Sequence, residues 1–316
     1  MRTAVLIPCY NEAQTIANVV RGFKIIDPDI DVYVYDNNST DGTATLAAEA
    51  GAIVVPEYRQ GKGYVVRSMF RDIEADCYVM VDGDETYRAD EALAMREYVR
   101  THQADMVIGD RLSSTYFEEN KRQFHGFGNL LVRWLVNRIF HSDVHDIMTG
   151  CRCFSRGFVK SFPILSGGFQ IETEMTIHAL DHNFLVKEVT IDYRDRPEGS
   201  HSKLNTFSDG FSVLGTIVVL FRDYRPSLFF GLISALLFLI AAIMFFVPFD
   251  EYLKTGFVTR VPTLVVAVAM GVSAMLSLVC GVILESTRAQ SRLFYELSLT
   301  LLKEHADIKR AVGGKE

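Results

Sequence analysis

The stretch Val79-Met80-Val81-Asp82-Gly83-Asp84-Glu85 decides the fold of this chain. Its apolar half continues a run that begins at Cys77 and predicts a buried strand, and the run ends in two aspartates one residue apart. Ligands of open α/β sheets bind at the carboxyl edge of the strands. Neighbouring carboxylates repel each other unless a cation lies between them, and Mg²⁺ takes one or two carboxylates together with substrate phosphates. The stretch therefore predicts a metal–diphosphate site, although Asp and Gly also form ordinary solvated turns.

Strands and helices alternate around this stretch. Apolar runs predict strands at 3–8, 31–35, 52–55, 77–81 and 105–109. Helices are expected between them, at about 13–23, 43–50, 61–74 and 90–101. This alternation is typical of a doubly wound, mostly parallel α/β sheet. The later segment 123–140 mixes apolar and basic residues, which predicts either a helix at a membrane interface or a helix packed under the sheet.

The last third of the chain contains two long apolar segments. Neither Ser227–Phe249 nor Pro262–Leu284 contains a charged residue. Because about 20 apolar residues cross a bilayer as a helix, the segments predict a transmembrane hairpin, with two buried core helices as the alternative. More arginines lie just outside the hairpin than in the loop that connects its two segments. Because basic residues favour the cytoplasmic side, this excess predicts that both termini are cytoplasmic. The expected divisions are a catalytic domain (1–204), an interfacial amphipathic helix (205–225), the hairpin (226–285, with spans at about 227–249 and 262–284) and a cytoplasmic tail (286–316).

Composition narrows the class of protein further. The formal net charge of −7 argues against a nucleic-acid partner. Five cysteines are an odd number and suit a reducing cytoplasm, and Cys151-x-Cys153 lacks further ligands at zinc spacing, so it is expected in the core. The N-terminus enters a strand pattern directly, without the features of a signal peptide. Together with the predicted hairpin, these features predict an integral protein of a plasma membrane, such as the bacterial inner membrane.

Four motifs, each at an expected strand end, carry a resemblance to a known family. They are Pro8-x-Tyr10-Asn11-Glu12, Asp36-x-x-Ser39-x-Asp41-Gly42-Thr43, Gly61-Lys62-Gly63 and Asp82-x-Asp84. In this order they closely resemble glycosyltransferase family 2, which has the GT-A fold. Further motifs resemble its polyprenyl-phosphate branch, which includes dolichyl-phosphate mannose synthase: Gly109-Asp110-Arg111, Asp146-x-x-Thr149-Gly150-Cys151-Arg152, Glu172-x-Glu174 and Arg196-x-x-Gly199-x-x-Ser202-Lys203. The chain departs from this pattern at Asn37, at Cys151 and at Glu85-Thr86-Tyr87, which leaves open whether Glu85 joins the metal ligands.

The resemblance implies a role for each group of residues. The nucleotide sugar is expected on Pro8, Tyr10, Asn11, Glu12, Asp36, Asn38, Lys62, Asp82 and Gly83. Mg²⁺ or Mn²⁺ is expected on Asp82 and Asp84. The catalytic residues would be Asp84, Asp146 and Arg152, and the acceptor phosphate would lie on Arg196, Ser202 and Lys203. If each motif is considered alone, the same residues are equally well explained as helix caps, strand ends or solvated loops.

The reaction implied is the inverting transfer of one sugar from a UDP- or GDP-linked donor to a polyprenyl phosphate, undecaprenyl or dolichyl, for cell-envelope glycan assembly. A phosphate monoester is largely dianionic at neutral pH, so Asp146 is expected to position groups rather than to act as an obligatory base. The alternatives are a family 2 transferase acting on a lipid or glycan hydroxyl and a non-catalytic membrane scaffold that binds nucleotide sugar. The sugar, the base, the choice of metal and the order of a homo-oligomer stay open.

Overall fold

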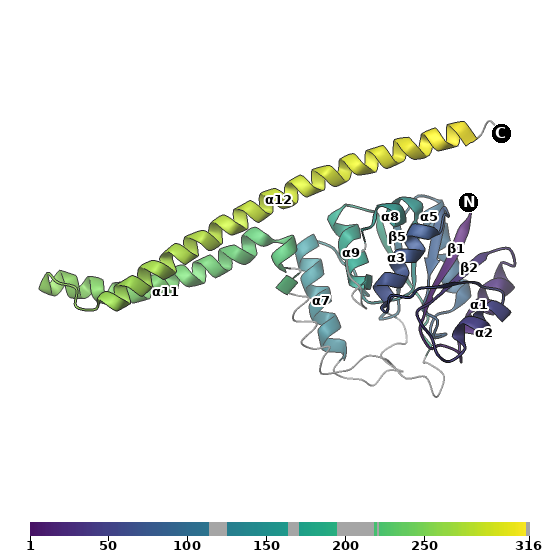
Figure 1. Cartoon of the computed structure of the whole chain (residues 1–316), viewed down its shortest axis with the longest axis horizontal. Helices are drawn as coiled ribbons and strands as arrows, with labels where there is room; N and C mark the ends of the chain where they lie inside the picture. Colours follow the sequence, from purple (N-terminus) through teal and green to yellow (C-terminus); the bar gives the residue numbers. More distant parts are fainter. Residues whose placement is uncertain (114–124, 164–170, 195–217, 220, 314–316) are drawn as a thin grey trace. The chain divides into compact units, whose positions relative to one another are not determined.

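The computed structural model describes residues 1–113, 125–163, 171–194, 218–219 and 221–313 (Figure 1). The chain divides into two compact units, residues 1–210 and 211–316. The predicted acceptor-phosphate residues Arg196, Ser202 and Lys203 lie outside the described residues, and so does most of the interfacial helix expected at 205–225.

A seven-stranded sheet forms the centre of the first unit. Its strands are β1 (Thr3–Cys9), β2 (Asp31–Asp36), β3 (Ile53–Pro56), β4 (Cys77–Met80), β5 (Met106–Asp110), β6 (Arg152–Ser155) and β7 (Val186–Thr190). They lie in the order β3-β2-β1-β4-β6-β5-β7. Every pairing is parallel except those of β6, which runs antiparallel to both of its neighbours. The expected mostly parallel α/β fold is therefore confirmed, with one reversed strand that apolar periodicity does not reveal.

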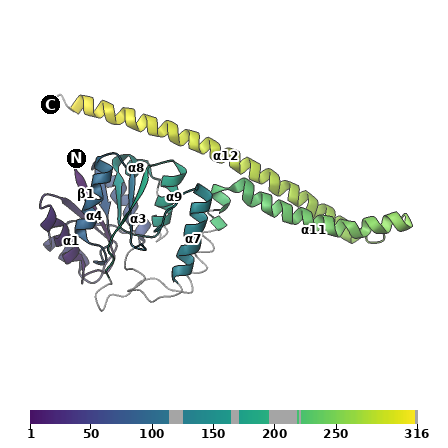
Figure 2. The same cartoon turned by 180° about the vertical axis from the view of Figure 1, so that it is seen from behind.

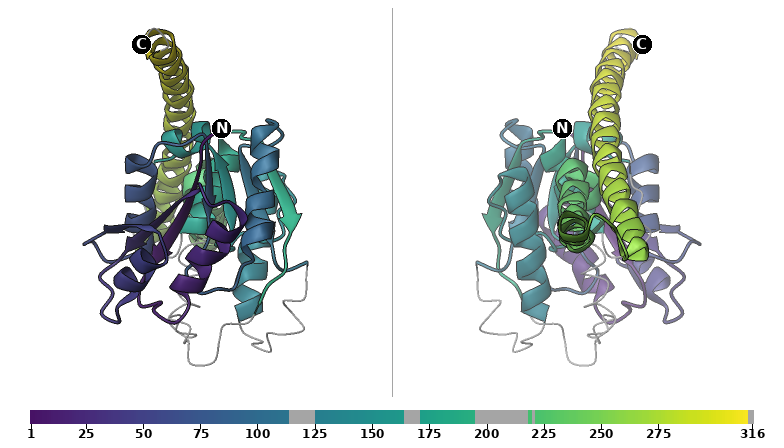
Figure 3. Two further views of the ribbon diagram at one scale, coloured as in Figure 1. Left: turned by 90° about the vertical axis from the view of Figure 1, so that its right-hand side faces the viewer. Right: turned by 90° about the vertical axis from the view of Figure 1, so that its left-hand side faces the viewer.

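Helices cover both faces of this sheet (Figures 2 and 3). They are α1 (Ile16–Ile26), α2 (Thr43–Glu49), α3 (Lys62–Asp72), α4 (Ala89–Ala94), α5 (Arg96–Arg100), α7 (His125–Phe140), α8 (Arg156–Ser161) and α9 (Ile171–Asp181). Alternate strand residues face opposite layers. Val5 and Ile7 of β1 belong to a core shared with α1, α4 and α5. On the other face, Phe154 of β6 packs against Phe70 of α3 and Phe158 of α8.

The strand register brings the predicted site residues to one edge. Cys9, at the end of β1, pairs with Asp36, at the end of β2. Met80, at the end of β4, pairs with Leu6 of β1. Because these strands are parallel, the segments that follow them emerge on the same side of the sheet. The cysteines of β4 and β6 are buried free thiols, with the Cys77 and Cys153 sulfurs 3.3 Å apart, as the core interpretation of Cys151-x-Cys153 expects.

The second unit contains two long helices, α11 (Pro226–Thr255) and α12 (Val261–Gly313). Both are long and apolar enough to cross a membrane, with mean hydropathies of 2.8 and 2.4 in their candidate spans. Serine hydroxyls join them inside the apolar region: Ser234 donates to the Ala274 carbonyl (2.7 Å) and Ser277 to the Phe230 carbonyl (3.0 Å). Such bonds and small residues at the contact are usual in membrane helix pairs.

The helices extend beyond the spans expected from the sequence. Helix α12 continues through the predicted tail as far as Gly313. Near the start of α11, the Glu285 carboxylate accepts a hydrogen bond from the Ser227 hydroxyl at 2.9 Å. A carboxylate at a helix N-terminus complements the positive end of the helix dipole. Glu285 therefore joins the two helices at the end where the chain enters and leaves the hairpin.

Candidate active site

The loop that carries the two aspartates is held at the carboxyl edge of the sheet. Asp84 is buried, with 3% of its surface exposed, and its Oδ1 atom accepts a hydrogen bond from the Thr86 hydroxyl at 2.6 Å. On the α1 side, the buried Thr15 hydroxyl donates to the Gly83 carbonyl at 2.6 Å. These two bonds anchor the loop at both ends, so the Asp84 carboxylate has a defined position before any ligand arrives.

Two glycines allow close approach around Asp82. A Cβ atom at Gly83 would lie 2.7 Å from the Cys9 sulfur, and one at Gly150 would overlap the Asp82 carboxylate. Ordinary side chains therefore do not fit at either position. The sequence analysis assigned Gly83 to nucleotide binding, and that role stays a prediction. What the structure explains is why a glycine is needed at this position: a side chain would collide with Cys9. Gly150 lies in the loop that follows Asp146, so this loop passes directly against the loop that carries Asp82 and Asp84.

The ammonium group of Lys62, at the start of α3, lies between two carboxylates. Its Nζ atom is 2.6 Å from Asp82 and 2.5 Å from Glu172 of α9. Burial lowers the pKa of Lys62, but the two carboxylates outweigh burial and hold that pKa well above its usual value. The sequence placed Lys62 beside a phosphate, and that role stays a prediction; the structure shows that Lys62 neutralises Asp82. Glu172 was quoted in a motif but was not among the predicted site residues, because only the tertiary fold brings α9 to the start of α3.

Asp36 presents an unsatisfied oxygen at the end of β2. Its Oδ2 atom accepts a hydrogen bond from the Ser39 amide at 3.2 Å, whereas its buried Oδ1 atom has no hydrogen-bond partner among the described residues. Buried polar atoms are nearly always paired, so an orphaned acceptor at a strand end indicates a missing donor. An N–H or O–H group of a ligand would supply it.

Asn37, one of the departures from the motif pattern, organises the next loop. Its Nδ2 atom donates to the carbonyls of Glu57 (2.9 Å) and Arg59 (2.7 Å), and its Oδ1 atom accepts from the Gly61 amide at 2.7 Å. A carboxylate can only accept hydrogen bonds, so it cannot make the first two contacts. The asparagine thus suits this loop, which leads to Lys62.

The remaining predicted nucleotide residues lie near the end of β1 and in the segments that follow β1 and β2. Asn11 and Asn38 adopt positive φ angles of 53° and 63°, which Asn tolerates better than most residues. The Asn11 Oδ1 atom accepts from the Thr40 amide at 2.8 Å, so the two loops are tied together. Pro8 lies within β1, and Glu12 directly precedes the turn into α1. Tyr10, by contrast, is 38% exposed at this edge, so its ring is accessible to a ligand.

Asp146 is held by an ion pair below the same edge. It is fully buried, and its Oδ2 atom lies 2.8 Å from Nε of Arg111, which follows β5. The backbone amide of Asp146 and that of His145 both donate to the Glu188 carboxylate of β7, at 3.1 and 2.8 Å. Charge-assisted bonds of this kind are stronger than neutral ones. Asp146 is thus positioned through both its side chain and its backbone, which suits the positioning role expected for it.

Tyr87 connects the two halves of the site. Its hydroxyl accepts a hydrogen bond from the Gly150 amide at 3.1 Å and lies 3.4 Å from the Thr149 hydroxyl and 3.5 Å from Nη1 of Arg111. Burial raises the pKa of Tyr87 well above its usual value, and the charges of Asp82 and Asp84 act in the same direction. The sequence noted Tyr87 only as a departure from the common pattern. Its contacts with two loops far apart in the sequence could not be found from local spacing.

Arg152, predicted as catalytic, is fully buried at the start of β6. It donates to the carbonyls of Thr149 (3.0 Å) and Ile147 (2.5 Å) and to the Thr176 hydroxyl of α9 (2.9 Å). Burial lowers its pKa to about 10, so the guanidinium is still charged at neutral pH. These contacts hold the loop after Asp146 against α9. They support a positioning role for Arg152, and direct catalysis stays a prediction.

The residues present fit a divalent cation at the end of β4. Asp82 and Asp84 supply carboxylate oxygens, the ligands that Mg²⁺ and Mn²⁺ prefer. The negative charges of Asp82 and Asp84 both act on the Tyr87 hydroxyl, so the two carboxylates lie near the same group. Glu85, left open as a third ligand, accepts a hydrogen bond from Asn18 of α1 at 3.2 Å. Its carboxylate thereby contributes to the packing of α1 against the loop.

Comparison with known proteins identifies the family. The family model for glycosyl transferase family 2 matches residues 4–162, the part that contains β1, β2, β4 and the aspartate loop. The chain belongs to glycosyltransferase family 2. As a member of that family, this glycosyltransferase transfers a sugar from a nucleotide-sugar donor. The resemblance predicted from the four strand-end motifs is thereby confirmed.

Two relatives and one solved structure extend the comparison. The glycosyltransferase is 35% identical over 228 residues to glycosyltransferase AglJ of Haloferax volcanii, covering 72% of this chain and 74% of AglJ. It is 25% identical over 216 residues to polyprenol monophosphomannose synthase of Mycolicibacterium smegmatis, covering 63% of this chain and 79% of that protein. The fold resembles glucosyl-3-phosphoglycerate synthase of Mycobacterium tuberculosis, solved with Mn²⁺, UDP and product, with a TM-score of 0.56 and 21% identity over 70% of this chain and 79% of that one. This likeness supports the GT-A fold.

Replacing Tyr87 with phenylalanine is expected to lower kcat for sugar transfer about ten-fold, because the Gly150 loop that packs against Asp82 loses a hydrogen bond that positions it. The ring and its edge contact with Tyr193 remain, whereas the Gly150 amide loses its acceptor. Steady-state kinetics with a varied donor would measure the change, and Tyr98→Phe, on α5, is the matched control. An unchanged kcat in Tyr87→Phe would remove the positioning role.

Proposed function

We propose that this glycosyltransferase transfers one sugar from a UDP- or GDP-linked donor to a polyprenyl phosphate at the cytoplasmic membrane surface, with inversion at the anomeric carbon. One observation carries the proposal: the chain that bears the carboxylate-lined sheet edge continues into two apolar helices with candidate membrane spans. A lipid acceptor is the substrate that such an anchor serves. The similarity to polyprenol monophosphomannose synthase supports this choice of acceptor.

In this proposal the donor nucleotide lies across the ends of β1 and β2. The unpartnered Asp36 Oδ1 atom would accept a hydrogen bond from the base or the ribose, and the exposed Tyr10 ring would cover the base. Asn11, Glu12 and Asn38 shape the loops around it, with Pro8 at the end of β1. Lys62 would place a positive charge near the diphosphate while it neutralises Asp82.

The bond changes follow from the substrates. An oxygen of the acceptor phosphate forms a bond to the anomeric carbon, the bond from that carbon to the donor diphosphate breaks, and the electron pair leaves with the nucleoside diphosphate. A divalent cation on Asp82 and Asp84 would stabilise the charge of this leaving group. Asp146, held by Arg111, would orient the sugar or the acceptor, since a dianionic phosphate needs no strong base. Arg196, Ser202 and Lys203 are proposed to bind the acceptor phosphate.

The membrane arrangement belongs to the same proposal. The catalytic domain (1–204) and both termini would be cytoplasmic, with the interfacial helix (205–225) before the hairpin and the tail (286–316) after it. A homo-oligomer is consistent with this arrangement, because a two-helix hairpin buries little surface by itself.

Donor and acceptor can be tested together. Membranes containing the protein are incubated with undecaprenyl phosphate, Mn²⁺ or Mg²⁺ and one radiolabelled nucleotide sugar at a time, and label is followed into the lipid phase. We expect one donor to be used and EDTA to abolish transfer. The control is the same membranes with Asp84→Asn.

Other outcomes would select the alternatives. A lipid product that forms only with a hydroxyl acceptor would indicate a family 2 transferase of that type. Nucleotide binding that needs no metal, with no transfer from any donor, would indicate the scaffold and overturn the catalytic assignment.

A further inference from the structure

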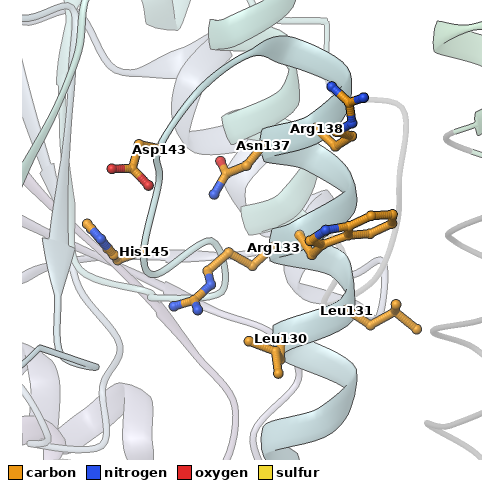
Figure 4. A pocket seen from close by; sticks show the side chains of 8 residues that line it. Leu130, Leu131, Arg133, Asn137, Arg138, Asp143 and His145 are labelled. Carbon is orange, nitrogen blue, oxygen red and sulfur yellow. The ribbon is translucent and has the colours of Figure 1, made fainter.

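The outer side of α7 borders a hollow that the proposed reaction does not use. The hollow has a volume of about 830 Å³ and is lined by side chains of α7 and of the turn that follows it (Figure 4). Its lining side chains are Leu130, Leu131, Arg133, Trp134, Asn137, Arg138, Asp143 and His145. All of them belong to the first unit.

Helix α7 has apolar residues on its buried side and also on its outward side. Val132, Val136 and Ile139 are buried and pack toward the unit. On the outward side, Leu130 is 52% exposed and Trp134 is 60% exposed. Exposed large apolar side chains that occur together mark interaction sites, and tryptophan is enriched at membrane–water interfaces.

Two arginines give this surface a positive charge. Within the described part of the chain, neither Arg133 nor Arg138 forms an ion pair or hydrogen bond, and Asp143 in the same hollow pairs with neither of them. Figure 4 shows the Arg133 guanidinium extending toward His145, whereas Arg138 lies farther along α7 and extends away from the turn that carries His145. The His145 ring is already engaged by Glu188, with Nδ1 and Oε2 3.0 Å apart. The two guanidinium groups are therefore the cationic groups available to a ligand here.

The wall opposite α7 is held in place. Asn137 donates to the Val144 carbonyl at 3.0 Å, and its Oδ1 atom accepts from the Val144 amide (3.0 Å) and the Ser142 hydroxyl (2.9 Å). One side chain thus fixes the turn against the helix. The hollow is formed by ordered elements, and a ligand would not have to create it.

We propose that this hollow binds the head group of an anionic phospholipid of the bilayer. The phosphodiester would lie on Arg133, with Arg138 adding a second charge, and the first methylene groups would contact Leu130, Leu131 and Trp134. An anionic leaflet attracts basic residues at its surface, and an arginine fork suits phosphate oxygens. The inference rests on the membrane attachment of the proposed function, since the first unit ends 16 residues before Pro226, where α11 begins. It does not depend on which acceptor receives the sugar.

The chain contains a single tryptophan, so Trp134 reports on this hollow alone. The full-length protein is placed in nanodiscs that contain the same fraction of brominated lipid, either phosphatidylglycerol or phosphatidylcholine, and Trp134 fluorescence is measured. We expect stronger quenching by the brominated phosphatidylglycerol. Each arginine should strengthen the anionic preference about five-fold, so Arg133→Gln with Arg138→Gln should abolish it.

The matched control is Arg21→Gln with Arg67→Gln, which removes the same charge from exposed positions of α1 and α3 and should keep the preference. Equal quenching by both lipids, or a preference that survives in Arg133→Gln/Arg138→Gln, would overturn the proposal. Loss of the preference on adding inorganic phosphate at constant ionic strength would assign the site to free phosphate instead. Sugar transfer is not measured, so a failed reaction and a failed lipid site remain distinguishable.

Discussion

Replacing Asp84 with asparagine is expected to lower the rate of sugar transfer by roughly 10²–10³-fold, because a carboxylate ligand of a catalytic cation contributes several kcal/mol. Asparagine has nearly the same shape, and its side-chain oxygen can still accept the 2.6 Å bond from the Thr86 hydroxyl. The loop should keep its conformation while the metal loses a charged ligand. Kinetics at increasing Mn²⁺, together with nucleotide affinity measured with and without Mn²⁺, would show the loss.

The neighbouring acid gives a matched control. Glu85→Gln removes the same charge from the same loop, but the Glu85 carboxylate contacts Asn18 of α1. Glutamine can still accept that hydrogen bond, so we expect transfer within about two-fold of the unmodified protein. If Asp84→Asn retained both its rate and the effect of metal on nucleotide affinity, Asp84 would not be a metal ligand. Equal losses in both variants would indicate a general effect of loop charge.

Replacing Lys62 with methionine is expected to lower the free energy of unfolding of the first unit by about 3–5 kcal/mol. The ammonium lies 2.6 Å from Asp82 and 2.5 Å from Glu172, and the side chains of Lys62 and Glu172 are 11% and 7% exposed. Without Lys62, two carboxylates face each other; the Asp82 side chain is 28% exposed, whereas Glu172 has little water to solvate it. Urea unfolding of the detergent-solubilised full chain, followed by Trp134 fluorescence, reports on this unit.

Two further variants separate charge from packing. Arg71→Met, on the same helix, removes a cation whose side chain is 66% exposed, so the unfolding midpoint should stay unchanged. Adding Glu172→Gln to Lys62→Met removes one of the two facing charges and should recover part of the lost stability. If the double variant were no more stable than Lys62→Met, carboxylate repulsion would not be the cause.

Much of the fold follows from local pattern. The run from Cys77 to Val81 is apolar throughout because β4 is buried on both faces, and the same holds for much of β1. Alternation of such strands with helices was enough to predict a mostly parallel sheet. The reversed direction of β6 was not predictable in this way, because apolar periodicity contains no information on strand direction. That direction depends on the side from which the chain enters the sheet after α7.

The candidate site likewise has a part that the sequence predicts and a part that only the structure reveals. The pairing of the parallel strands makes the sequences after β1, β2 and β4 meet at one edge, so Asp36, Asp82 and Asp84 were found from sequence as a group. The contacts of Lys62 with Glu172 join residues from α3 and α9. No spacing rule predicts such a pair, since it depends on how the helices pack.

The sequence by itself determined the order of the first five strands and of the helices between them, the strand-end motifs of glycosyltransferase family 2 and the two apolar helices, because each depends on residues close together in the chain. Only the tertiary structure decided that Lys62 neutralises Asp82, that Tyr87 joins the Gly150 loop to Arg111 and that Arg152 is buried behind the site. These depend on packing between distant segments. The same packing places Arg133 and Trp134 along one hollow beside α7, where local pattern alone left a helix at a membrane interface and a helix packed under the sheet equally open.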